Sequence, residues 1–83
     1  MVIINDAGLH TRAALKIVEV AREAKHGVWV SKDDQRADAA SVIDLLTLYC
    51  PKGSEITLEI DHIHDKYIFH EIVSRIENGF GEL

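Results

Sequence analysis

The sequence has little of several features that define whole classes of protein. Its 83 residues include one cysteine, Cys50, so the chain can form neither an internal disulfide nor a cysteine-based zinc site. No apolar run approaches the ~20 residues that a membrane-spanning helix needs, and no charged-then-apolar leader precedes the first apolar segment. These absences predict a cytoplasmic protein without membrane insertion.

Positive charge is also scarce. Nine lysines and arginines stand against fourteen acidic residues, for a net charge of −5, and we expect no nucleic-acid partner because a phosphate backbone binds to a positive surface. The imbalance is concentrated in residues 54–83, which carry seven acidic and two basic residues. The less acidic end, residues 1–27, therefore suits an acidic ligand or partner better.

The remaining composition and the apolar pattern predict a small layered fold. Apolar residues make up 47% of the chain and charged residues 28%, which is ordinary for a globular protein, and we expect one domain over residues 1–83. Short β-branched or alternating runs predict strands at 2–5, 28–32, 36–39 and 54–61. Apolar residues at three- and four-residue steps predict helices at 11–25, at 42–48 and in the segment before Gly79. The order β-α-β-β-α-β-α predicts an α/β (α+β) open-faced sandwich, in which three helices cover one face of a four-stranded antiparallel sheet.

The stretch AGLHTRAALK, residues 7–16, brings a glycine, a histidine, an arginine and a helix start together. The first N–H groups of a helix lack internal partners and lie at the positive end of its dipole, which favours a phosphate. His10 would offer a nucleophilic imidazole to a phosphoryl group, and Arg12 a charge-assisted donor to its oxygens. The spacing alone fits a phosphohistidine site only weakly, and an ordinary loop histidine explains it as well.

The segment GLHTRAA, residues 8–14, resembles the active-site signature of HPr, the histidine-containing phosphocarrier family of the bacterial phosphoenolpyruvate-dependent sugar phosphotransferase system. The resemblance extends over essentially the whole chain through ADAASVIDLL, KGSEITLEI and IENGFGE. It implies that His10 takes a phosphoryl group from enzyme I and gives it to a sugar-specific IIA domain, with Arg12 as the phosphate partner. It further implies a monomeric phosphoryl relay protein without a cofactor, rather than a stand-alone enzyme.

The helix predicted at 42–48 has two interpretations. By the resemblance, Ser41 matches the serine that HPr kinase/phosphorylase modifies in some bacterial groups, and the apolar docking surface matches Leu15, Val42, Ile43 and Leu46. From the residues alone, Ser41 and Asp44 fit a helix capping box. The helix is apolar almost all round, which indicates either burial or a docking patch.

Two positions depart from the family pattern. Ala13 stands where the family usually has proline, which leaves the start of the helix less pre-organised. Tyr49 stands where members commonly have glycine, so the end of the short helix can differ. Either departure fits a divergent paralogue rather than the main sugar carrier. A separate, second hypothesis is that the chain is an HPr-like regulatory binding module controlled through Ser41.

The other histidines predict no chemistry of their own. His62 and His64 would share one face of a strand and could bind a transition metal, but they lie where the strand gives way to a loop. The spacing shows no third ligand, although His70 is near in sequence. We therefore expect a solvated loop pair and no metal site.

Overall fold

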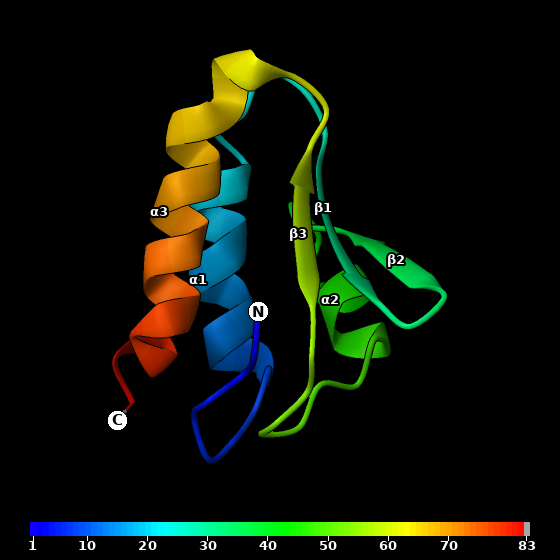
Figure 1. The fold of residues 1–83 in the computed structure, drawn as a ribbon, viewed down its shortest axis with the longest axis vertical. Helices are drawn as coiled ribbons and strands as arrows, with labels where there is room; N and C mark the ends of the chain where they lie inside the picture. Colours follow the sequence, from blue (N-terminus) through cyan, green and yellow to red (C-terminus); the bar gives the residue numbers. More distant parts are fainter. Residues whose placement is uncertain (83) are drawn as a thin grey trace.

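The computed structural model describes residues 1–82, and Figure 1 shows how its elements are arranged. No helix of this part of the chain has both the length and the apolar character that crossing a membrane requires. The helices and strands follow in the order α1 (Thr11–Ala21), β1 (Val28–Lys32), β2 (Gln35–Asp38), α2 (Val42–Thr47), β3 (Thr57–Ile60) and α3 (Lys66–Glu77). Two short 3-10 helices flank α3, η1 (Ile63–Asp65) before it and η2 (Gly79–Gly81) after it.

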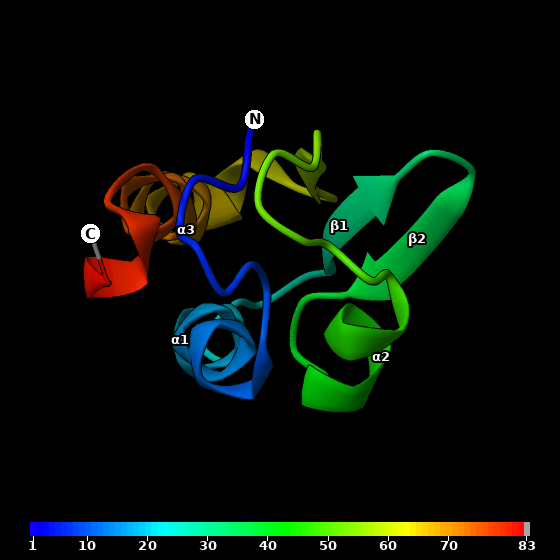
Figure 2. The same cartoon turned by 90° about the horizontal axis from the view of Figure 1, so that it is seen from below.

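The sheet has three antiparallel strands in the order β2-β1-β3. Val30 of β1 lies opposite Ala37 of β2 and Leu58 of β3, and all three side chains are buried. Their neighbours along the strands point to the other face, where Arg36 and Glu59 are exposed. The three helices gather on the buried face (Figure 2), so the alternation of apolar residues predicted the open-faced arrangement correctly.

The fourth strand, predicted at 2–5, is wrong. Val2 forms a single isolated bridge with Glu55, and no ladder follows. The Ile3 N–H donates to the Ser54 carbonyl, and the Ile3 carbonyl accepts from the Gly53 N–H. The chain then turns, since the Asn5 carbonyl accepts from the Gly8 N–H, and the pairing ends there. β-branched residues favour extended backbone, but they do not supply a partner strand of matching length.

The helix predicted at 11–25 ends early, at Ala21. The reason lies far along the chain, in the buried carboxylate of Asp65. Its two oxygens accept hydrogen bonds from the N–H groups of Lys25 at 2.9 Å and His26 at 2.8 Å. Those two N–H groups therefore donate to Asp65 instead of to carbonyls of the preceding helical turn, and the backbone leaves the helical path.

The core lies between the helices and the sheet. The apolar stripe predicted for the last helix is confirmed, with Ile72 and Ile76 buried and with Phe69 and Val73 packed against the core. Phe80 folds back onto this core and keeps 2% of its surface exposed. The turn after α3 is thereby fixed against α1, and this turn positions the functional site.

Candidate functional site

His10 is the N-cap of α1, as the sequence predicts. Its backbone is extended, with φ −85° and ψ −179°, and its Nδ1 accepts a hydrogen bond from the Arg12 N–H at 3.3 Å. The side chain keeps 32% of its surface exposed. An imidazole therefore lies directly before the positive end of the helix dipole, where an incoming anion is stabilised.

Gly8 determines how the chain reaches this position. Its φ is +67°, in the left-handed region, and a Cβ at this residue would lie 2.5 Å from the Cys50 carbonyl oxygen. The Leu9 N–H donates to that same carbonyl at 2.8 Å. The histidine loop therefore lies directly on the loop of residues 50–51, and only glycine allows this approach.

Glu82 completes the site, and the sequence alone did not reveal it. Its Oε2 lies 2.6 Å from Nε2 of His10. Its Oε1 accepts from the amide nitrogen of Asn5 at 2.8 Å, and that amide also donates to the Gly8 carbonyl at 2.7 Å. Asn5 is fully buried, and its Oδ1 has no hydrogen-bond partner in the described chain. Its side-chain amide is therefore oriented so that the nitrogen reaches the Gly8 carbonyl and Glu82.

The electrostatics of this contact favour a charged carboxylate. The hydrogen bond from Asn5 lowers the pKa of Glu82 the most, the hydrogen bond with His10 lowers it further, and the charges of His10 and Lys16 add to the effect. A carboxylate at this position orients the ring and stabilises positive charge on it. No spacing rule links a histidine to an acid 72 positions later. The sequence pointed to this region only through the segment IENGFGE, which contributes to the family resemblance.

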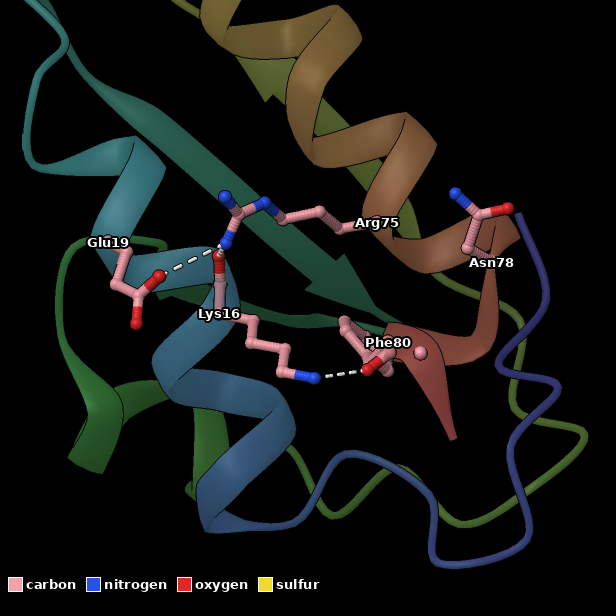
Figure 3. A pocket seen from close by; sticks show the side chains of 6 residues that line it. Lys16, Glu19, Arg75, Asn78 and Phe80 are labelled. Atoms are coloured by element: carbon pink, nitrogen blue, oxygen red, sulfur yellow. Dashed lines mark hydrogen bonds and ion pairs between the residues drawn. The ribbon is translucent and has the colours of Figure 1, made fainter. Parts of the chain in front are cut away.

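A set of contacts joins α1 to the end of α3 and the turn after it (Figure 3). The amine of Lys16 donates to the carbonyl of Phe80, and Arg75 donates to the carbonyl of Lys16 at 3.0 Å and to Glu19 at 3.1 Å. These side chains line a groove between the two helices. The turn that carries Glu82 is therefore bound to the same helix that His10 caps.

Arg12 contacts the His10 imidazole through its backbone N–H, and its side chain makes no hydrogen bond to the ring. Its side chain is exposed, and among residues 1–82 its guanidinium has neither a hydrogen bond nor an ion pair. An arginine without a protein partner at the start of a helix remains available to an anion bound there.

The predicted apolar residues divide between core and surface. Leu45 and Leu48 of the short helix segment are buried, whereas Ile43 is 76% exposed and Leu46 is 37% exposed. Leu15 of α1 is 45% exposed, and Val42 is half-buried. The prediction of burial is thus confirmed for Leu45 and Leu48, and docking stays a prediction for the residues that remain exposed. We give the name apolar patch to four exposed or half-buried residues, which are Leu15, Val42, Ile43 and Leu46.

A hollow connects His10 with the apolar patch. It is lined by Ala7, Leu9, His10, Leu46, Tyr49, Cys50 and Pro51. Cys50 itself is buried, and burial raises the pKa of its thiol. The thiol therefore stays protonated, and Cys50 lines the hollow as a structural residue. A partner seated on Leu46 would therefore come close to the imidazole.

Ser41 is the N-cap of α2, as predicted, but the capping box is only half formed. Its Oγ accepts from the Asp44 N–H at 3.2 Å. The Ser41 N–H donates to the carbonyl of Asp38 and not to the side chain of Asp44. The hydroxyl lies at the start of the helix that carries Val42 and Ile43 of the apolar patch.

Tyr49 occupies a backbone conformation that favours glycine. It follows Leu48, the C-cap of α2, and has a φ of +51°. The amine of Lys32 donates to the Tyr49 carbonyl and lies 5.5 Å from the centre of its ring. The helix therefore ends in the left-handed turn that a glycine would make, with a lysine compensating the exposed carbonyls.

Residues 1–78 match the family model described as "PTS HPr component phosphorylation site". The chain is 38% identical over 80 residues to the phosphocarrier protein HPr of Neisseria meningitidis serogroup B, a match that covers 96% of this chain and 90% of that protein. It is 31% identical over 81 residues to the phosphocarrier protein NPr of Escherichia coli K12, with 96% and 90% covered. The crystal structure of HPr-C-His from Thermoanaerobacter tengcongensis is similar with a TM-score of 0.92 at 29% identity, over 100% of this chain and 93% of that one. The chain therefore belongs to the HPr family, the phosphocarrier proteins of the phosphotransferase system.

Proposed function

We propose that this chain accepts a phosphoryl group on His10 from enzyme I and passes it to sugar-specific IIA domains. The observation that carries the proposal is the His10 imidazole, which caps α1 with Nδ1 toward the helix and with Nε2 bound by Glu82. In this proposal the chain works as a cytoplasmic monomer without a cofactor. HPr kinase/phosphorylase is a further partner in bacteria that contain it.

The two contacts of the ring assign its roles. Because Nε2 faces a carboxylate at 2.6 Å, the neutral ring carries its hydrogen there and its lone pair on Nδ1. We therefore assign the nucleophile to Nδ1, whose bond to phosphorus forms while the bond between phosphorus and the donor atom of enzyme I breaks. Glu82 would offset the positive charge that develops on the ring as this bond forms.

The surroundings support the transferred group as well. The open N–H groups at the start of α1 and the free guanidinium of Arg12 can donate hydrogen bonds to the phosphoryl oxygens. The apolar patch lies next to this position and offers surface for a partner that delivers or removes the group. A shared docking surface suits a carrier, because donor and acceptor must reach the same nitrogen in turn.

The test is transfer from phosphoenolpyruvate through enzyme I. Incubation with both, followed by intact-mass measurement, should show one added phosphoryl group that is lost in acid. His10→Gln should remain unmodified, and His70→Gln, a change of another exposed histidine, should be modified like the parent protein. An acid-labile adduct that persists in His10→Gln would contradict the assignment.

A second candidate function follows from Ser41. Its hydroxyl caps α2 and is adjacent to the apolar patch, so a phosphate on it would change docking there. The chain would then act as a regulatory binding module whose state is set at Ser41. Transfer through His10 separates the two functions, because a purely regulatory module does not need that nucleophile.

A further inference from the structure

Three histidines gather at the end of the molecule opposite to His10. They are His26, in the turn after α1, and His62 and His64, at the start of η1. The turn after α1 lies at the end of that helix away from its N-cap (Figure 1). A ligand nitrogen of each lies within 4.8 Å of one on each of the others, and all three side chains are exposed. The spacing of His62 and His64 suggested two ligands only; the fold supplies the third.

The backbone segments that carry these rings are fixed to one another. Asp65, which directly follows His64, is buried and accepts the N–H groups of Lys25 and His26. The turn after α1 therefore cannot move away from η1 without breaking two charge-assisted hydrogen bonds. The Asp65 carboxylate also places a negative charge next to the cluster, which favours a bound cation.

The rings themselves are close enough to converge on one ion. The ring centre of His62 lies 4.6 Å from that of His26 and 4.0 Å from that of His64. A tetrahedral ion with bonds of about 2.0–2.1 Å requires ligand nitrogens roughly 3.3 Å apart. The three side chains are exposed, so rotation about their side-chain bonds, which also breaks the stacking of His26 on His62, covers the remaining difference.

We propose that His26, His62 and His64 bind one divalent transition-metal ion of the late first row, with Zn²⁺ as the representative. Three imidazoles suit Zn²⁺, Ni²⁺ and Cu²⁺, and they do not suit Mg²⁺ or Ca²⁺, which take oxygen ligands. Water completes the coordination, because the cluster faces solvent. The ion would cross-link the turn after α1 to η1.

Binding requires one local exchange. Nδ1 of His62 accepts a hydrogen bond from the His64 N–H at 3.0 Å. A neutral imidazole has one free lone pair, so His62 must give up this bond before it binds the ion. The Asp65 anchors are separate from this contact and remain in place, so the exchange leaves the two segments together.

The test is a calorimetric titration of the full chain with ZnCl₂ in a buffer that does not bind zinc. We expect one ion per chain and a Tm that rises with zinc concentration, because the ion binds the folded state. His26→Gln and His64→Gln should each weaken binding by at least about tenfold. His70→Gln is the matched control, since it removes an exposed histidine outside the cluster, and it should bind like the parent protein.

Spectra of the histidine rings provide a second measurement that does not depend on variants. Added Zn²⁺ should shift the NMR signals of the three cluster imidazoles and leave those of His10 and His70 in place. The proposal is overturned by shifts at His10, by unchanged affinity in both cluster variants, or by half an ion per chain with a dimer in light scattering. The last result would assign the metal to a contact between two copies.

Discussion

Nε2 of His10 lies 2.6 Å from Oε2 of Glu82, although 72 positions separate the two residues in the chain. The contact joins the start of α1 to the turn after α3, so the ring orientation depends on the folded C-terminal segment. It also gives the two ring nitrogens different surroundings, because Nε2 is bound to a carboxylate and Nδ1 faces the helix. The proposed nucleophile, Nδ1, is thus oriented before any partner arrives, and it must give up the hydrogen bond from the Arg12 N–H when it binds phosphorus.

Replacing Glu82 should slow phosphorylation. Glu82→Gln keeps the shape of the side chain but removes the negative charge that offsets charge on the ring, so we expect transfer from enzyme I to be at least about tenfold slower. Rapid-quench measurement of the phosphorylated fraction checks this. Glu77→Gln, a change of an exposed acid on α3, is the control, and equal rates in the two variants would remove Glu82 from the site.

The same carboxylate should contribute to acid sensitivity. The pKa of Glu82 is lowered in the folded chain, chiefly by the hydrogen bond from Asn5 and then by that with His10. Its stabilising contribution is therefore present above its unfolded pKa and is lost as the pH falls through the folded pKa. Urea midpoints should thus differ between the parent protein and Glu82→Gln at neutral pH and converge in strong acid. A difference that is the same at both pH values would contradict this linkage.

Arg12 should matter for transfer and little for stability. Its guanidinium is exposed and unpaired within residues 1–82, so Arg12→Ala should leave Tm almost unchanged while transfer slows about tenfold. Arg22→Ala removes the same charge at the other end of α1 and should transfer normally. A rate that falls equally in both variants would indicate a general charge effect instead.

The two roles of Ser41 can be separated by two substitutions. Ser41→Asp keeps a cap for α2 but adds charge beside Val42, so it should fold normally and accept phosphate at His10 much more slowly. Ser41→Ala loses the cap, which should cost about 1 kcal/mol of stability without blocking transfer. Rates from enzyme I and urea midpoints give both quantities. Equal transfer by the two variants would leave Ser41 as a cap only.

Tyr49→Gly should stabilise the chain. The φ of +51° at this position costs a bulky residue about 1 kcal/mol, which glycine does not pay. Tyr67 is exposed in the first turn of α3, and Tyr67→Gly should instead destabilise by a similar amount because glycine loses more backbone freedom than other residues on entering a helix. Opposite shifts in the urea midpoints are expected, and a loss of stability in Tyr49→Gly would show that the contact with Lys32 matters more.

Local signals predicted the parts of the fold that local forces determine. The start of α1 at His10, the strand at 28–32 and the cap at Ser41 follow from neighbouring residues, and the structure has all three. The strand at 2–5 was wrong because its partner segment, 53–56, allows one bridge only. Glu82 was not found for the same physical reason: a contact between distant segments leaves no periodic trace in either of them.

Asp65 and Glu82 flank α3 and reach the two ends of α1, one at the turn that closes it and the other at its first cap. The two helices are accordingly of nearly equal length, with eleven and twelve residues. α3 therefore acts as a spacer that sets where Glu82 meets His10. One residue inserted into its middle would advance everything beyond by about 1.5 Å and 100° around the axis. That change would separate the carboxylate from the imidazole while leaving every residue of the histidine loop in place.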